Sequence, residues 1–92
     1  MEKIVEGIPA SLHGDLSKKL VAIVLGATNK NAVPTELAKK IIYLWRQDQL
    51  ASSTGIKTIL EAAVKVDVEK THRILDELGL QQQSSALQRL RL

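Results

Sequence analysis

The residues best suited to metal chemistry are oxygen-bearing side chains between two expected helices. Asn29, Asn31 and Glu36 place two amide oxygens one residue apart and a carboxylate further along, at the head of a helix. Calcium prefers oxygen ligands of this kind, but a full calcium loop is longer and richer in acidic side chains. The pattern therefore predicts weak calcium binding as one alternative. The other is a plain polar loop, in which Glu36 stabilises the positive end of the helix dipole.

Groups that could carry out catalysis are sparse. His13 and His72 are the only histidines, and Asp76 lies one helical turn from His72, which falls short of a full zinc coordination sphere. The absence of cysteine excludes disulfides, thiolate ligands and cysteine nucleophiles. The glycines are scattered, and no hydroxyl belongs to a recognisable catalytic pattern. We expect His13 in a loop, His72 on a helix surface, and a protein that is not an enzyme and needs no cofactor.

Two helices are expected in the first half of the chain. Asp15 is a good N-cap, and apolar residues follow it at helical spacing as far as residue 27. Pro34 predicts the first turn of a second helix, which fades near residues 49–51. The spacing on this second helix predicts a buried face made of Leu37, Ala38, Ile41, Ile42, Leu44 and Trp45.

Two more helices are expected before residue 80. Candidate N-caps for the third helix are Ser52, Ser53 and Thr54. Asp67 caps the fourth, and Gly79 ends it because glycine enters the left-handed conformation at no steric cost. Short connections between these helices predict an all-α fold, a compact orthogonal bundle of four or five helices. We expect Leu20, Ile41 and Ile74 to be buried where helices cross.

Residues 81–92 are expected to follow a single helical domain formed by residues 1–80. Residues 81–85 are polar and of low complexity, which is typical of a linker. The last seven residues, ALQRLRL, contain three leucines and predict a short amphipathic segment that docks on a surface.

Residues 60–80 resemble the helix-turn-helix of DNA-binding proteins. The resemblance rests on apolar residues at the spacing that holds two helices near a right angle: Leu60, Val64, Val66, Thr71 and Ile74. The turn LDELGL at residues 75–80 is similar to the end of a winged-helix recognition helix. No alternating β-branched run follows it, so a wingless, all-helical version is expected. The alternative is an ordinary helical hairpin whose apolar residues only build the core.

The resemblance implies that the second helix of the motif contacts DNA. The residues nearest the major groove would be Glu69, Lys70, His72 and Arg73. Further cations on the earlier helix would add phosphate contacts: Lys39, Lys40 and Arg46. The expected function is a small nucleic-acid-binding or transcription-associated protein. The alternative is a helical binding module for a protein partner, through the C-terminal segment, or for calcium.

Composition agrees with either function. The net charge of +3 permits contact with a polyanion without requiring it. Ninety-two residues, 45% of them hydrophobic and none of them Phe, fit one small domain with an aliphatic core. The longest apolar run, residues 20–27, is far shorter than the roughly 20 residues of a membrane span. The N-terminus lacks the order of a signal peptide, so a cytoplasmic protein without membrane contact is expected.

Overall fold

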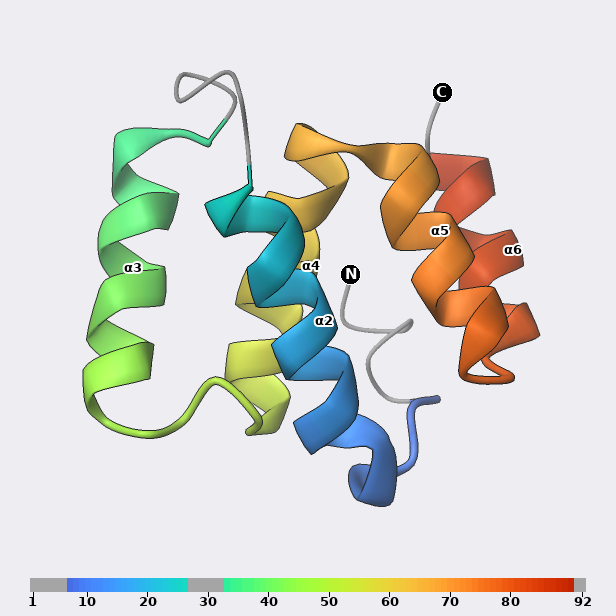
Figure 1. Ribbon diagram of the computed structural model, residues 1–92, viewed down its shortest axis with the longest axis horizontal. Coiled ribbons are helices and arrows are strands. Elements are labelled where there is room, and N and C mark those ends of the chain that lie inside the picture. The colour runs from blue at the N-terminus through green and yellow to red at the C-terminus, as the bar shows by residue number, and fades with distance from the viewer. Residues whose placement is uncertain (1–6, 27–32, 91–92) are drawn as a thin grey trace.

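Five α-helices and one short 3-10 helix make up the regular structure of the computed structural model, which describes residues 7–26 and 33–90 (Figure 1). The 3-10 helix is η1 (Ala10–Leu12), and the α-helices are α2 (His13–Leu25), α3 (Thr35–Arg46), α4 (Ser53–Val66), α5 (Val68–Glu77) and α6 (Gln81–Leu90). The described residues contain no strand, which confirms the predicted all-α bundle. None of these helices has the length and apolar character needed to cross a membrane.

The core forms where α2 packs against α4. Leu16 and Leu20 of α2 and Ile59 of α4 have no exposed surface. Each such side chain contributes roughly 1.5–3 kcal/mol by leaving water. Leu20 is therefore buried as predicted, whereas Ile41 and Ile74 are only half buried at the edge of this core.

The other helices are arranged around the α2–α4 pair. α5 packs against both helices and carries α6, while α3 packs against α4 on the opposite side of the molecule (Figure 1). α3 makes at most marginal contact with α2. The α5 side of the bundle is therefore more enclosed than the α3 side, because α5 packs closely against three helices and α3 against one.

Side-chain caps fix the ends of α4 and α5 as the sequence predicts. Ser52 Oγ accepts a hydrogen bond from the backbone N–H of Gly55 at 3.0 Å, and Asp67 Oδ1 accepts one from the N–H of Lys70 at 3.0 Å. Gly79, just after α5, has a φ of 76°, in the left-handed region that favours glycine. These positions therefore fold as local sequence dictates.

Three predicted boundaries are wrong. α3 ends at Arg46, before the predicted end near residues 49–51. α2 begins at His13, so Asp15 lies inside its first turn instead of capping it, because η1 runs directly into α2 and the chain is already helical. Residues 81–85, predicted to be a polar linker, form the start of α6. Gln83 and Ser84 are buried there because α6 packs against α5. Their polar side chains had led to the prediction that they are exposed.

Candidate functional site

α3 exposes apolar side chains that the sequence places in the core. Trp45 is 69% exposed and Ile42 is 47% exposed, so both predictions of burial are wrong. Leu44 is the buried residue of this helix, and the other expected core residues are half buried: Leu37, Ala38 and Ile41. Because α3 packs closely only on α4, its apolar arc is wider than the surface that covers it. Trp45 and Ile42 form the uncovered part of that arc.

A groove of about 420 Å³ lies between α2 and the end of α3. The α2 side is lined by Gly14, Ser17, Lys18 and Val21. The other side is lined by Trp45, Asp48, Leu50 and Ala51. We call this feature the α2–α3 groove. Its lining is mostly apolar, and its volume is typical of clefts that bind ligands.

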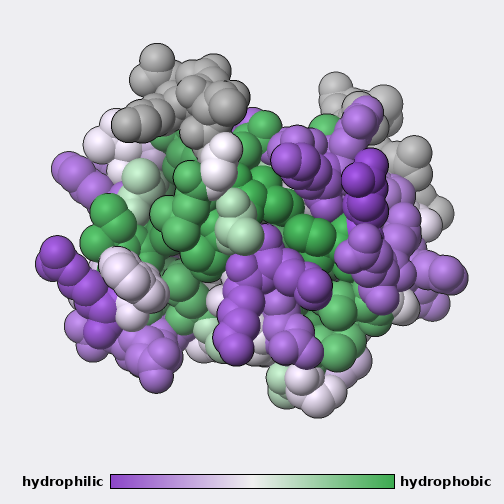
Figure 2. All heavy atoms as spheres, viewed as in Figure 1, coloured by the Kyte–Doolittle hydropathy of each residue, from purple (hydrophilic) through white to green (hydrophobic). Residues whose placement is uncertain are grey.

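Apolar surface continues beyond the α2–α3 groove. Leu25 is 81% exposed and lies one helical turn after Val21 on α2, as Ile42 lies one turn before Trp45 on α3. Figure 2 shows hydrophobic atoms gathered over α3, α2 and α4, with hydrophilic atoms around them. We call the exposed apolar surface formed by Val21 and Leu25 of α2 and by Ile42 and Trp45 of α3 the apolar strip. It is longer than the groove itself.

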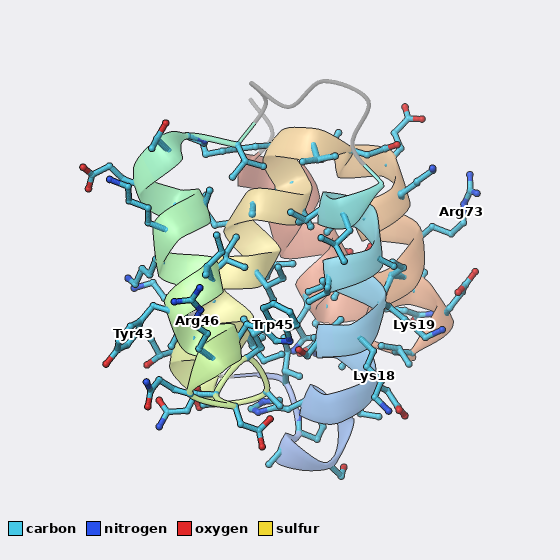
Figure 3. All side chains as sticks on the ribbon, turned by 60° about the vertical axis from the view of Figure 1, so that its left-hand side comes forward. Lys18, Lys19, Tyr43, Trp45, Arg46 and Arg73 are labelled. Carbon is cyan, nitrogen blue, oxygen red and sulfur yellow. The ribbon has the colours of Figure 1, made fainter. Side chains whose placement is uncertain are left out.

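The two aromatic side chains of α3 point to different sides. Trp45 points from α3 toward α2, whereas Tyr43 points away from α2 (Figure 3). Residues two apart on a helix are separated by roughly 200° around its axis, so the two rings lie on nearly opposite faces. Trp45 alone belongs to the groove, and it is the only tryptophan in the chain.

The connection from α3 to α4 closes one end of the groove and is held firmly. Gly55 packs so closely against it that a Cβ there would lie 2.1 Å from the carbonyl oxygen of Gln49. The hydroxyl of Ser52 donates a hydrogen bond to the same carbonyl at 2.6 Å. His13 Nδ1 lies 3.1 Å from the carbonyl oxygen of Ala51. His13, expected in a loop, is therefore a helical residue that joins α2 to this connection.

Cations border the groove on both sides. Lys18 lines it on α2, and Lys39 and Arg46 lie one turn before and one turn after Ile42 on α3. In Figure 3, Lys18 and Arg46 lie on either side of Trp45. All three cations are exposed, and none pairs with a carboxylate in the part of the chain that the structure describes. Asp48 is the acidic residue that lines the groove, so Lys18 and Arg46, on either side of Trp45, outnumber it by one.

The structure separates the two groups of predicted nucleic-acid residues. Lys70, His72 and Arg73 lie on α5, whereas the earlier group lies on α3: Lys39, Lys40 and Arg46. The α2–α4 pair stands between these helices (Figure 1). The exposed charges of α5 are also mixed, because Lys70 and Arg73 are accompanied by three acidic side chains: Glu69, Asp76 and Glu77. The six residues therefore do not form one continuous basic surface.

The predicted calcium ligands are only partly described. Glu36 is exposed in the first turn of α3, while Asn29 and Asn31 lie outside the described residues. Within residues 7–26 and 33–90, no three His, Asp or Glu side chains gather closely enough to hold a metal ion. Glu36 does stand where a carboxylate stabilises the positive end of a helix. Calcium binding stays a prediction.

The pair of His72 and Asp76 noted in the sequence is joined by a residue that the sequence did not indicate, Ser84 of α6. Ser84 Oγ lies 3.0 Å from Nδ1 and 2.9 Å from Nε2 of His72, and Nδ1 lies 3.2 Å from Oδ2 of Asp76. These are the residue types of a hydrolytic triad. However, Ser84 is 1% exposed, and its nearly equal distances place Oγ beside the whole ring instead of in line with one nitrogen. His72, expected on a helix surface, is half buried and connects the two helices.

The groove could be found only in part from sequence. The wide apolar arc of α3, with Trp45 at its edge, was visible as a pattern. Val21 of α2 and Leu50 of the connection are ordinary apolar residues with no signal of their own, and only tertiary packing places them beside Trp45. Comparison with protein-family models, with curated proteins and with solved structures finds no match.

Proposed function

We propose that this protein is a non-enzymatic binding module that holds an amphipathic helix of a protein partner in the α2–α3 groove. The observation that carries the proposal is Trp45, 69% exposed at the wall of a mostly apolar groove. Tryptophan is among the residues that contribute most to protein interfaces when a partner buries it. Contiguous exposed apolar surface is also typical of interaction sites.

The form of the groove supports a helix as its occupant. α2 and α3 both pack on α4 but stand apart from each other, so a helix laid between them would complete a four-helix arrangement. α3 has 12 residues, about 18 Å at a rise of roughly 1.5 Å per residue. A partner helix of similar length would place apolar anchors along the strip at the spacing used in helix-in-groove recognition. Strand addition has no support, because no sheet edge exists in the described residues.

The test uses a fluorescein-labelled peptide of about 18 residues, long enough to span roughly 27 Å as a helix. It carries Leu and Ala on one helical face and Gln elsewhere, so that its binding does not depend on charge. Fluorescence anisotropy measures its affinity for the wild-type protein and for Trp45→Ala. Burial of an interface tryptophan is worth about 2 kcal/mol or more, so Trp45→Ala should weaken binding by about thirtyfold.

Tyr43→Ala is the matched control. Tyr43 is an aromatic residue of the same helix and is 64% exposed, but it points away from the groove. Its removal should leave the affinity unchanged, and both variants should stay folded because both side chains are largely exposed. Equal losses in the two variants, or no binding of the peptide to the wild-type protein at millimolar concentration, would reject the groove as a helix-binding site.

A second candidate function, binding of duplex DNA, is favoured by the α4–α5 hairpin. The single residue Asp67 joins these helices and caps α5, at the place where the helix-turn-helix was predicted. Lys70 and Arg73 are exposed on α5. If α5 contacts DNA, Lys70→Glu combined with Arg73→Glu should abolish a low-salt gel shift and leave the circular dichroism spectrum intact. An unchanged shift would reject α5 as the contact.

A further inference from the structure

We infer, building on the function proposed for the α2–α3 groove, that the partner helix is acidic along both edges of its apolar face. Two cations carry the inference: Lys18 lines the α2 side of the groove, and Arg46 of α3 lies on the other side of Trp45 (Figure 3). A helix inserted between α2 and α3 would bring its two flanks next to these cations.

The balance of charge at the groove favours carboxylates on those flanks. Asp48 also lines the groove, and it belongs to the connection between α3 and α4, whereas Lys18 and Arg46 belong to the two helices on either side. Lys18 and Arg46 are exposed, and neither has a carboxylate partner in the described residues. A partner with basic flanks would meet like charges, which disfavours binding and slows association.

The α5 side of the molecule would attract an acidic helix less strongly than the α2–α3 groove. The outer face of α5 carries Glu69, Asp76 and Glu77 beside its two cations. An acidic helix is therefore directed to the α2–α3 side and away from α5 by the distribution of charge over the whole protein. Steering of this kind weakens as salt shortens the range of electrostatic interaction, to about 8 Å at physiological ionic strength.

A single-stranded nucleic acid is the competing anionic occupant, and the groove fits it less well. Binding of single strands without sequence preference relies on aromatic rings arranged so that successive bases stack. Trp45 and Tyr43 point to nearly opposite sides of α3, so they do not form one stacking platform (Figure 3). The apolar strip through Ile42 and Leu25 would also stay uncovered by a sugar-phosphate chain. An apolar helix face covers the strip and presents its carboxylates at the edges.

The experiment compares three peptides with the same Leu and Ala face and with Glu, Gln or Lys along both edges. None contains tryptophan, so the fluorescence of Trp45, the only tryptophan of the protein, reports binding in the groove directly. In 20 mM salt the Glu peptide should bind about tenfold more tightly than the Gln peptide, and the Lys peptide should bind most weakly. Several exposed ion pairs, each weak by itself, together account for this difference. It should shrink as salt is raised.

Two neighbouring lysines of α2 provide the matched variants. Lys18 lines the groove, whereas Lys19 lies on the side of α2 away from α3 (Figure 3). Lys18→Glu, and more strongly Lys18→Glu with Arg46→Glu, should weaken the Glu peptide and strengthen the Lys peptide. Lys19→Glu changes the net charge by the same amount as Lys18→Glu and should leave the order of the three peptides unchanged.

The outcomes separate this inference from the function on which it rests. Equal affinity of the Glu and Gln peptides, or equal effects of Lys18→Glu and Lys19→Glu, would overturn the inference that the partner helix has acidic edges. Such a result would leave the proposed helix-binding function of the groove intact. Failure of all three peptides to change Trp45 fluorescence would overturn the groove function as well. Binding of oligo-dT that is lost in Trp45→Ala would identify a nucleic acid as the occupant. Self-association that the same substitution abolishes, seen by sedimentation, would identify a second copy of this chain. Either result overturns the inference.

Discussion

Gly55 is the position where a single methyl group should do the most damage. A Cβ on Gly55 would lie 2.1 Å from the carbonyl oxygen of Gln49 and 2.5 Å from the backbone of Leu50. Real Cβ atoms stay beyond 3.0 Å, so α4 and the connection must separate by about 0.9 Å. The obstructing atoms are backbone and cannot rotate away. Overpacking of this kind costs about 3 kcal/mol, and the better helix propensity of alanine recovers about 1 kcal/mol. Gly55→Ala should therefore lower the free energy of unfolding by about 2 kcal/mol.

Gly14→Ala is the matched control for this prediction. Gly14 is also helical, but a Cβ there would meet nothing within 4 Å. The substitution should stabilise the protein by about 0.4–1 kcal/mol, because alanine loses less backbone entropy on folding. Urea titrations followed by circular dichroism measure both variants, and Gly55→Ala should also melt roughly 8–16 °C below the wild type. Equal stability of the two variants would refute the close packing of α4 against the α3–α4 connection.

Four further substitutions probe the core, a cap and the α5–α6 contact. Leu20→Ala should lower the free energy of unfolding by about 2–5 kcal/mol, and Ile41→Ala clearly less because that side chain is half buried; equal costs in urea titrations would contradict the difference in burial. Asp67→Ala should cost about 0.5–2 kcal/mol by removing the cap of α5, and an unchanged denaturation midpoint would mean that the cap is not formed. Ser84→Ala should speed amide hydrogen exchange in α6 and leave exchange in α4 unaffected, since the Ser84 hydroxyl contacts His72 across the α5–α6 interface. Exchange rates in α6 equal to those of the wild type would show that this contact does not stabilise α6.

The helix ends show which structural features can be predicted from local sequence. Ser52, Asp67 and Gly79 act through hydrogen bonds or dihedral angles within a few residues, so the pattern that predicts them needs no knowledge of the fold. Asp15 shows the limit of the same reasoning. It has the right residue type for an N-cap, but the preceding turn is already helical, and nothing in the local pattern indicates this.

Burial on α3 depends on more than its sequence. The spacing of apolar residues along α3, among them Leu44 and Ile42, follows from its sequence alone. How much of this apolar face is buried depends on how many other helices pack against it. α3 packs closely on α4 alone, so Leu44 is buried and Trp45 remains exposed. The same argument explains the buried Ser84 in α6, where a neighbouring helix covers a residue that the sequence pattern placed in solvent.

The sequence by itself determined the all-α class, most of the helix boundaries and the burial of Leu20, because these follow from capping and from periodicity along one chain. Only the tertiary structure decided the candidate site. The groove combines one wall of α2, the exposed edge of α3 and the connection that Gly55 holds in place. Lys18 and Arg46 are far apart in the sequence, and they lie on either side of Trp45 because α2 and α3 both pack on α4.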